Sequence, residues 1–321
     1  MVELRRYKEN PILEPNPENQ WEAKAVFNSA ALYLKGKVYL IYRAQSNTNV
    51  STFGLAISSN GYDIDERLEY PIYVPREHFE LRYSERCMKN TGVEDPRVTI
   101  IDDRIYMLYT AVGERFDYVR VALTSISIKD FLKEKWGKWE KPIPISPPGA
   151  WDKDAAILPK RIKGKYFIFH RFFPNIWIDT VRSLDFKEKP WIRGYEYIKR
   201  RTDKWDCLRI GIGPTPIEVS EGWLVIYHGV DRNNVYKLGA MLLDKENPTC
   251  VISRLDYPIL EPKEKYEVEG VVNNVVFSNG AVVLNDELFV YYGGADRCLC
   301  LATIELTELI AELLKNSGAG I

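Results

Sequence analysis

Residues 92–101 read GVEDPRVTII, so that two carboxylates, a proline and an arginine open a run of β-branched apolar residues. A run of this kind is typical of a β-strand. Pro96 has no amide hydrogen and disfavours helix at the residue before it, so Glu94 and Asp95 are predicted to lie where the strand begins. One interpretation is a strand-opening turn with an Asp–Arg pair, and the other is a polar site for a small ligand. We weigh them against the rest of the chain, whose pattern repeats around this stretch.

An aromatic-rich strand pattern, introduced by a turn that contains Gly or Asp, recurs along the chain. Its aligned aromatic residues stand 67, 60, 58 and 65 residues apart, and they are Tyr42, Tyr109, Phe169, Tyr227 and Tyr292. An apolar strand pattern precedes and follows each of them. A proline-bracketed segment also recurs, at residues 10–15, 70–75, 142–147 and 257–262. Because proline cannot donate to a strand ladder, these segments are predicted to be outer strands of a sheet.

Four strands in each unit and five units predict an all-β fold, a five-bladed β-propeller that forms a single domain over residues 1–321. A β-sandwich with a second domain is the alternative, but it does not explain why the same pattern returns five times. A short C-terminal helix is predicted over about residues 306–316, with Gly318 beyond its end. A second short helix is predicted between Lys129 and Trp136.

The composition narrows the classes of partner. The chain has 44 basic and 45 acidic residues, a formal net charge of -1, which argues against nucleic acid because phosphate backbones require a basic excess. Its 20 Tyr and 8 Trp suit both sheets and surfaces that stack on sugars. The cysteine number is odd and no CxxC pair occurs, so we expect free thiols and no zinc site. Without an apolar leader or membrane-length run, we expect a soluble cytoplasmic protein with no membrane partner; a homo-oligomer stays open.

Polar residues recur in register where the innermost strands open. Asn28, Asp95 and Asp154 are 67 and 59 residues apart, close to the aromatic repeat. Polar residues at strand positions that should be apolar predict a shared central pocket. The other charged candidates for this pocket are Arg43, Lys153, Arg171, Arg209, His228 and Asp296. Converging cations indicate a small anion such as phosphate, whereas salt bridges that close the ring are the structural alternative.

The most specific motifs are FNSA at 27–30, YR at 42–43, EDPR at 94–97, KDA at 153–155, GIGP at 211–214, YHG at 227–229 and YGGAD at 292–296. Together they resemble glycoside hydrolase family 130, the β-mannoside phosphorylases and related β-mannosidases, from Asn10 to about Ala302. The resemblance implies a five-bladed propeller, in agreement with the repeat count.

The resemblance also implies roles for single residues. Asp95 is expected to be the catalytic acid of an inverting reaction, with its proton reaching the glycosidic oxygen through a hydroxyl of the bound mannose. Phosphate would then attack the anomeric carbon from the opposite face and leave as α-mannose 1-phosphate. The expected phosphate-binding residues are Lys153, Arg171, Arg209 and His228, and the expected substrate-binding residues are Asn28, Ser29, Arg43, Glu94, Arg97, Asp154 and Asp296.

The chain departs from the family pattern in places. Lys153-Asp154 stands where many phosphorylases have Arg-Asn, Arg209 replaces a lysine, and Thr52 replaces an arginine of some members. The four phosphate-binding positions all stay basic, which favours phosphorolysis, and the overall pattern resembles members acting on β-1,2-linked mannosides. The segment Val74–Lys89 is predicted to overhang the acceptor sugar.

Two other functions stay open. An inverting β-mannosidase would need a second carboxylate to activate water, supplied by Asp154 or Glu94. A non-catalytic carbohydrate-binding propeller would use Asp95 only as a hydrogen-bonding group. No cofactor is expected, with inorganic phosphate as co-substrate, and no metal, because the three histidines are scattered and no carboxylate cluster has ligand spacing.

Overall fold

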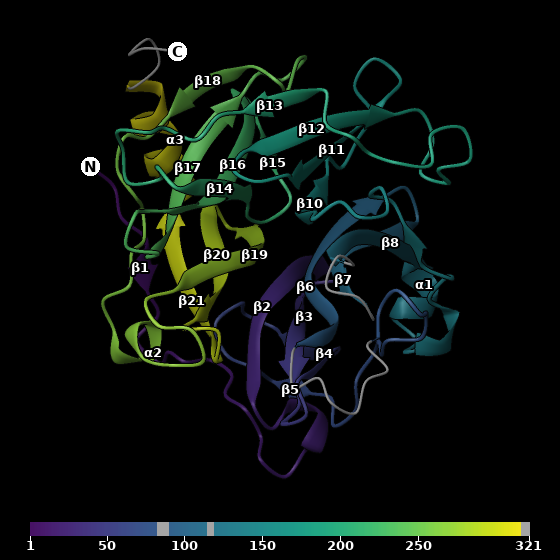
Figure 1. Ribbon diagram of the computed structural model, residues 1–321. Helices are drawn as coiled ribbons and strands as arrows, with labels where there is room; N and C mark the ends of the chain where they lie inside the picture. Colours follow the sequence, from purple (N-terminus) through teal and green to yellow (C-terminus); the bar gives the residue numbers. More distant parts are fainter. Residues whose placement is uncertain (82–89, 114–118, 316–321) are drawn as a thin grey trace.

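The computed structural model describes residues 1–81, 90–113 and 119–315. Strands account for 47% of the structure and helices for 8%, so the predicted all-β class is confirmed. Most strands pair in antiparallel fashion with the strands next to them in the sequence (Figure 1). The fold is therefore built from consecutive meanders, which suit alternating apolar strands joined by short Gly, Asn and Asp turns.

The meanders form units that follow one another along the chain, with four strands in each except the fourth, where β14 and β15 both pair with β16. The first contains β2 (Ala25–Leu34), β3 (Lys37–Gln45), β4 (Val50–Ser58) and β5 (Glu66–Arg67), and the second β6 (Thr91–Ile101), β7 (Arg104–Val112), β8 (Val119–Ser127) and β9 (Ile143–Pro144). The third contains β10 (Lys153–Ile157), β11 (Tyr166–Arg171), β12 (Ile176–Val181) and β13 (Glu196–Ile198). The fourth contains β14 (Arg209–Ile212), β15 (Ile217–Val219), β16 (Gly222–Val230), β17 (Tyr236–Leu243) and β18 (Val251–Arg254). The fifth contains β19 (Val276–Leu284), β20 (Glu287–Gly294), β21 (Cys298–Glu305) and, from the other end of the chain, β1 (Arg5–Arg6).

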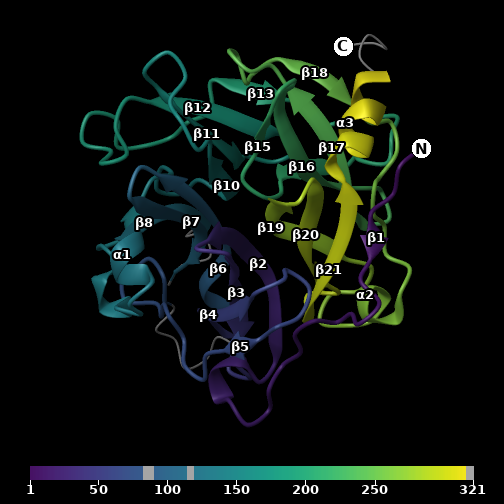
Figure 2. The same ribbon diagram turned by 180° about the vertical axis from the view of Figure 1, so that it is seen from behind.

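The first strands of the first, second, third and fifth units lie toward the middle of the molecule. Figures 1 and 2, seen from opposite sides, both place β2, β6, β10 and β19 nearest the centre. Polar side chains connect these inner strands. The Arg97 guanidinium donates to the carbonyls of Gly213 (2.6 Å) and Ile212 (2.8 Å), and Thr99 donates to Ile157 O (2.8 Å). These buried bonds tie the second unit to the third and fourth.

The apolar core lies between units. One cluster joins the first and second units, including Phe53 and Met107, and others join the second to the third, the third to the fourth and the fourth to the fifth. A further cluster joins the fifth unit to the first, with Tyr291 against Leu40. Each sheet thus buries apolar side chains on both faces, which explains why the aromatic-rich strands show little alternation with polar residues.

Short helices lie outside the sheets. They are η1 (Gln20–Glu22), α1 (Ile128–Phe131), η2 (Trp136–Lys138), α2 (Lys265–Val268) and α3 (Leu306–Lys315). Helix α3 confirms the predicted C-terminal helix up to Lys315, and its buried Leu309 and Leu313 pack on the cluster between the fourth and fifth units. The predicted helix between Lys129 and Trp136 is instead the short α1, capped by Ser127, followed by η2.

The proline-bracketed segments differ from the prediction. Only residues 142–147 supply an outer strand, β9, among the described residues. The other three each make single bridges, Leu13–Leu299, Phe53–Tyr73 and Leu238–Leu260. The outer strands of the corresponding units are β1, β5 and β18, which precede these segments. Proline lacks the amide hydrogen that a strand donates to its neighbour. The segments therefore run beside the third strand of a sheet but do not pair with it over several residues.

Strand β1, which pairs with β21, carries one partner of a buried ion pair. Arg6 donates to both carboxylate oxygens of Glu267 (2.8 and 2.9 Å), and Tyr292 also donates to Glu267 (2.7 Å). Burial opposes ionisation of Glu267, but the Arg6 contact and the other hydrogen bonds hold its pKa below the usual value.

We predict that Arg6→Met destabilises the protein by roughly 3–5 kcal/mol, because it leaves a fully buried carboxylate without its cation. Arg5→Met, in the same strand but exposed, is the matched control and should change the unfolding free energy by less than about 0.5 kcal/mol. Denaturant titrations at pH 7 measure both. Equal midpoints for the two variants would contradict a stabilising role for the Arg6–Glu267 pair.

Candidate active site

A shared backbone feature turns polar side chains toward the centre. Asn28, Asp95 and Asp154 have left-handed backbones, with φ of 49°, 54° and 51°. Each lies where the pairing of its inner strand shifts register, in β2, β6 and β10. An extra residue in one strand re-aims a side chain, and Asn and Asp tolerate the left-handed region better than most residues. The recurring polar positions in the sequence therefore correspond to recurring β-bulges.

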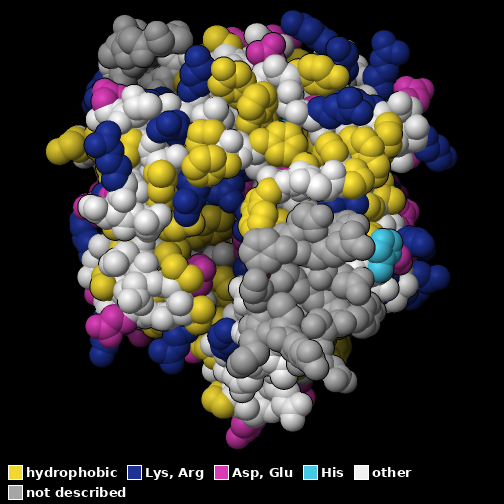
Figure 3. All heavy atoms as spheres, in the orientation of Figure 1, with side chains coloured by type: hydrophobic (Ala, Val, Ile, Leu, Met, Phe, Trp, Pro, Cys, Tyr) yellow, Lys and Arg dark blue, Asp and Glu magenta, His cyan; other side chains and the backbone are white. Residues whose placement is uncertain are grey.

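The bulges open onto a cavity of about 200 Å³. Figure 3 shows this face of the molecule hollowed near its centre, with basic and acidic side chains beside the hollow. The lining combines carboxylates, cations, amides and a few apolar groups. Its residues are Asn28, Arg43, Asn90, Glu94, Asp95, Lys153, Asp154, Arg171, Tyr236, Val272, Val275, Phe277 and Asp296.

One side of the cavity is organised by Arg43. Its guanidinium lies 2.7 Å from Glu94 Oε1 and 3.3 Å from Asp95 Oδ1, and its Nε donates to Ser51 (3.1 Å). Asn28 donates to the same Asp95 oxygen (2.9 Å). Burial opposes the charge on Arg43, but Glu94 and Asp95 raise its pKa. The contacts orient the Asp95 carboxyl while all four polar side chains around it stay buried.

The other side carries cations around Asp154. Arg171 Nε lies 2.9 Å from Asp154 Oδ2, and Lys153, the preceding residue, also lines the cavity. Burial alone would raise the pKa of Asp154, but Arg171, His228 and Arg97 hold it well below the usual range. Asp154 is therefore an ionised carboxylate that neutralises part of the positive charge of this side.

Three predicted site residues lie behind the lining. His228 is fully buried, with Nε2 3.5 Å from Asp154 Oδ2, and burial lowers its pKa to about 4 despite that neighbour, so it is neutral at pH 7. Arg97 is 1% exposed and its guanidinium contacts backbone carbonyls and Asp154 (3.6 Å). Ser29 is fully buried. These residues can act on a ligand through the groups in front of them.

Arg209 is held by an aromatic neighbour. Its guanidinium lies 5.1 Å from the centre of the Tyr236 ring and donates to the Tyr236 hydroxyl. Tyr236, Asn90 and Phe277 line the cavity, and sequence reasoning missed all three. Tyr236 opens the third strand of its unit, two residues after the Asn233-Asn234 turn, which is the one signal that could have identified it. Residues 82–89 of the predicted acceptor-facing segment lie outside the described residues.

A second buried network supports the cation side from behind. His170, next to Arg171 in β11, lies between Asp152 (3.0 Å) and Asp179 (3.3 Å). Burial works against its charge, but the two carboxylates raise the pKa of His170 to about 9. Asp152 directly precedes Lys153, and His170 directly precedes Arg171. The ion pairs of His170 with Asp152 and Asp179 therefore fix the backbone that presents Lys153 and Arg171.

Metal-binding clusters and membrane-spanning helices are both absent from the described residues. In residues 1–81, 90–113 and 119–315, His, Cys, Asp and Glu do not gather in groups of three or more that could hold a metal ion. None of the helices in these ranges is long and apolar enough to span a membrane.

Known proteins resemble the chain over nearly its whole length. A profile of glycoside hydrolase family 130, described as β-1,4-mannooligosaccharide phosphorylase, matches residues 3–315. A 1,2-β-oligomannan phosphorylase of Thermoanaerobacter sp. (strain X514) is 40% identical over 96% of this chain and 99% of its own. A β-1,2-mannobiose phosphorylase of the same organism is also 40% identical, over 95% of this chain and 98% of its own.

A solved structure agrees with these matches. The β-1,2-mannobiose phosphorylase of Listeria innocua, in complex with β-1,2-mannobiose, superposes with a TM-score of 0.81 at 26% identity, covering 97% of this chain and 99% of that one. The family profile and the relatives differ in the linkage that they name.

The charge of Asp296 yields a prediction. Burial raises its pKa to about 7, helped by Asp95 and Glu94 and opposed by Arg43. A carboxyl whose pKa is raised from 3.8 to about 7 on folding destabilises the folded protein increasingly as the pH rises between these values.

We therefore expect Asp296→Asn to raise the melting temperature at pH 8 by a few degrees, with a much smaller gain at pH 4. Thermal unfolding at the two pH values measures the difference. The exposed Asp203→Asn is the control and should give no pH-dependent gain. A gain of the same size at both pH values would show that ionisation of Asp296 is not its cause.

Proposed function

Because the chain belongs to glycoside hydrolase family 130, we propose that it is an inverting phosphorylase that shortens β-1,2-linked manno-oligosaccharides and releases α-mannose 1-phosphate. The observation that carries this proposal is the cavity, whose lining combines a hydrogen-bonded acid, Asp95, with the cations Lys153 and Arg171. The full-length similarity to enzymes named for β-1,2 linkages supports the linkage.

We further infer that the five units close into a β-propeller with the cavity at its centre. Two features support closure: the apolar cluster between the fifth and first units, and the pairing of β1 with β21 in one sheet. In a propeller, the innermost strands face a common axis, so bulges at the same position of several units bring distant residues together. We also propose a cytoplasmic location, supported by the four described cysteines, which are free.

In the proposed reaction, Asp95 supplies the proton for the departing sugar. The bond between the anomeric carbon and the glycosidic oxygen breaks, and that oxygen takes a proton that passes from Asp95 through a mannose hydroxyl. A phosphate oxygen forms the new bond from the opposite face, which turns a β-linkage into an α-phosphate. Arg43 and Asn28 fix the Asp95 carboxyl, so its geometry is set before substrate binds.

Phosphate is proposed to bind at Lys153 and Arg171, with Arg209 as a further cation and His228 acting through Asp154. Charge-assisted hydrogen bonds from arginine and lysine suit a phosphate dianion. Asp154 would limit the net positive charge of this side, so that phosphate binds there but the product phosphate ester can leave. Asn28 and Asp296 are proposed to position the mannose ring, with Ser29 supporting them from behind the lining.

The hydrolytic alternative needs a second carboxylate that can activate water. Asp154 is 2% exposed and paired with Arg171, and Glu94 is paired with Arg43 at 2.7 Å. Both candidates are thus engaged by guanidinium groups, which favour an inert anion over a base. Phosphorolysis needs only Asp95, because phosphate is itself the nucleophile.

The first test is to incubate the protein with β-1,2-mannobiose with and without inorganic phosphate. We expect α-mannose 1-phosphate to form only with phosphate, and Asp95→Asn to lower turnover by at least about 100-fold, the range for loss of a general acid. Ion chromatography measures the amount of mannose 1-phosphate formed. NMR of its anomeric phosphate group gives the configuration at the anomeric carbon. Free mannose at an equal rate without phosphate would instead establish hydrolysis.

A second prediction tests the anion site. Arg171→Ala should raise the Michaelis constant for phosphate about 10- to 100-fold, the equivalent of the roughly 1.5–3 kcal/mol of a hydrogen bond to a charged group. Arg182→Ala, an exposed arginine of the same unit, is the control. Because Arg171→Ala also removes the nearest cation of Asp154, the double variant with Asp154→Asn separates the two effects. Recovery of wild-type phosphate affinity in the double variant would remove Arg171 from the proposed phosphate site.

A further inference from the structure

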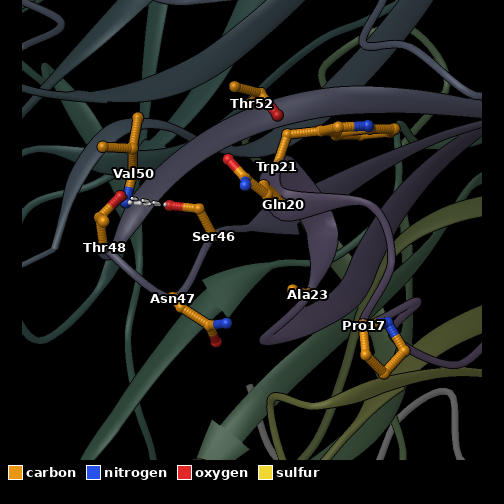
Figure 4. A pocket seen from close by; sticks show the side chains of 9 residues that line it. All are labelled: Pro17, Gln20, Trp21, Ala23, Ser46, Asn47, Thr48, Val50 and Thr52. Carbon is orange, nitrogen blue, oxygen red and sulfur yellow. Dashed lines mark hydrogen bonds between the residues drawn. The ribbon is translucent and has the colours of Figure 1, made fainter.

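A second hollow lies beside the first unit, and we call it the outer groove. It has a volume of about 490 Å³, more than twice that of the central cavity. Helix η1 and the turn between β3 and β4 form its walls (Figure 4). Its lining residues are Pro17, Gln20, Trp21, Ala23, Ser46, Asn47, Thr48, Val50 and Thr52.

The outer groove and the central cavity share strand β4. Ser51 accepts a hydrogen bond from Arg43, which lines the cavity, whereas its neighbours Val50 and Thr52 line the groove. Successive side chains of a strand point to opposite faces. The two hollows therefore lie on the two faces of one strand, near the turn formed by residues 46–49.

The lining chemistry excludes ionic ligands. None of the described residues that line the outer groove carries a charge, whereas the central cavity contains carboxylates and cations. The groove offers amides from Gln20 and Asn47, several hydroxyls and one indole. Amides and hydroxyls both donate and accept hydrogen bonds, and an indole face packs on apolar ring surface. This combination suits a neutral polyhydroxylated ring, which is a sugar.

Thr52 lacks the partner that its burial demands. It is 7% exposed, and its hydroxyl makes no hydrogen bond within the described residues. Figure 4 shows this hydroxyl on the side of Thr52 that faces Gln20 and Trp21. Buried polar atoms are nearly always hydrogen-bonded, so a free hydroxyl that faces a groove indicates a partner supplied by a ligand.

The walls are held in place without a ligand. The indole of Trp21 stacks on Tyr42, with ring centres 6.3 Å apart and planes 21° apart, and its Nε1 donates to Glu69 O (3.2 Å). The turn is fixed by Ser46, whose hydroxyl lies 2.9 Å from that of Thr48 and accepts from Val50 N (3.1 Å). A groove that is already shaped loses little freedom on binding.

We propose that the outer groove binds mannosyl units of an oligomannan chain that lie beyond the linkage being cleaved. This inference rests on the proposed function, because that function supplies a chain of neutral sugars as substrate. The central cavity is smaller than most small-molecule sites, so it holds the reacting sugar and phosphate but little more of a long substrate. The outer groove, on the other face of strand β4, provides contacts for the further mannosyl units of longer substrates.

The test compares short and long substrates in the variants Trp21→Ala and Thr52→Val. We expect both to weaken binding of β-1,2-linked mannohexaose about 10-fold or more, measured by calorimetry without phosphate, and to leave phosphorolysis of β-1,2-mannobiose within about twofold of wild type. Thr52→Val keeps the shape of the side chain and removes a hydroxyl without a protein partner, so it folds like wild type and decides the matter if Trp21→Ala is unstable.

Two matched controls isolate the groove. Thr110→Val removes another buried hydroxyl without a partner in the described structure, and Tyr195→Ala removes an aromatic ring that is 70% exposed in the third unit. Neither should change mannohexaose binding. Unchanged mannohexaose affinity in Thr52→Val, or an equal loss on mannobiose, would overturn the proposal. Because calorimetry needs no turnover, this result stays readable if phosphate-dependent cleavage is absent.

Discussion

The site depends on a backbone constraint, the left-handed residue at the start of three inner strands. At Asn28, Asp95 and Asp154 the strand carries one residue more than its partner, and the side chain turns from the sheet face toward the centre. A regular strand would direct these side chains into the apolar layers between sheets, where an unpaired carboxylate is costly. The bulge therefore allows a largely apolar strand to carry one polar group to the cavity. Such a site favours Asn, Asp or Gly at these positions, because they adopt the left-handed region at a lower cost than most other residues.

Charge is balanced within the cavity by close pairing of opposite groups. Arg43 pairs with Glu94 and Asp95 on one side, and Asp154 pairs with Arg171 on the other. A cavity with unpaired cations would bind anions tightly and release them slowly, whereas a paired cavity exchanges one anion for another. The neutral state of the buried His228 fits this arrangement, because burial and the nearby Arg171 and Arg97 disfavour a further positive charge behind Asp154.

Sequence patterns predicted the strands well because an aromatic-rich strand after a turn is a local signal. They also predicted that Asn28, Asp95 and Asp154 share one site, since equal spacing in a repeat means equal position. They could not predict how far each side chain lies from the cavity surface. His228 and Arg97 have residue types typical of ligand contacts, yet both lie behind the cavity lining. Tyr236 was missed for the opposite reason, because a tyrosine in a β-rich chain is indistinguishable from a core residue until its neighbours in space are known.

The pairing of β1 with β21 has a consequence for synthesis. Arg5 and Arg6 pair with Thr303 and Ala302, so one sheet joins residues almost 300 positions apart in the sequence. While the ribosome is still making the last unit, β1 has no partner, and the apolar faces of the first and fourth units lack their neighbour. Contacts of such high sequence separation slow folding, and unpaired strand edges invite association with other chains. The nascent protein is thus at its most vulnerable to aggregation until its final strand emerges.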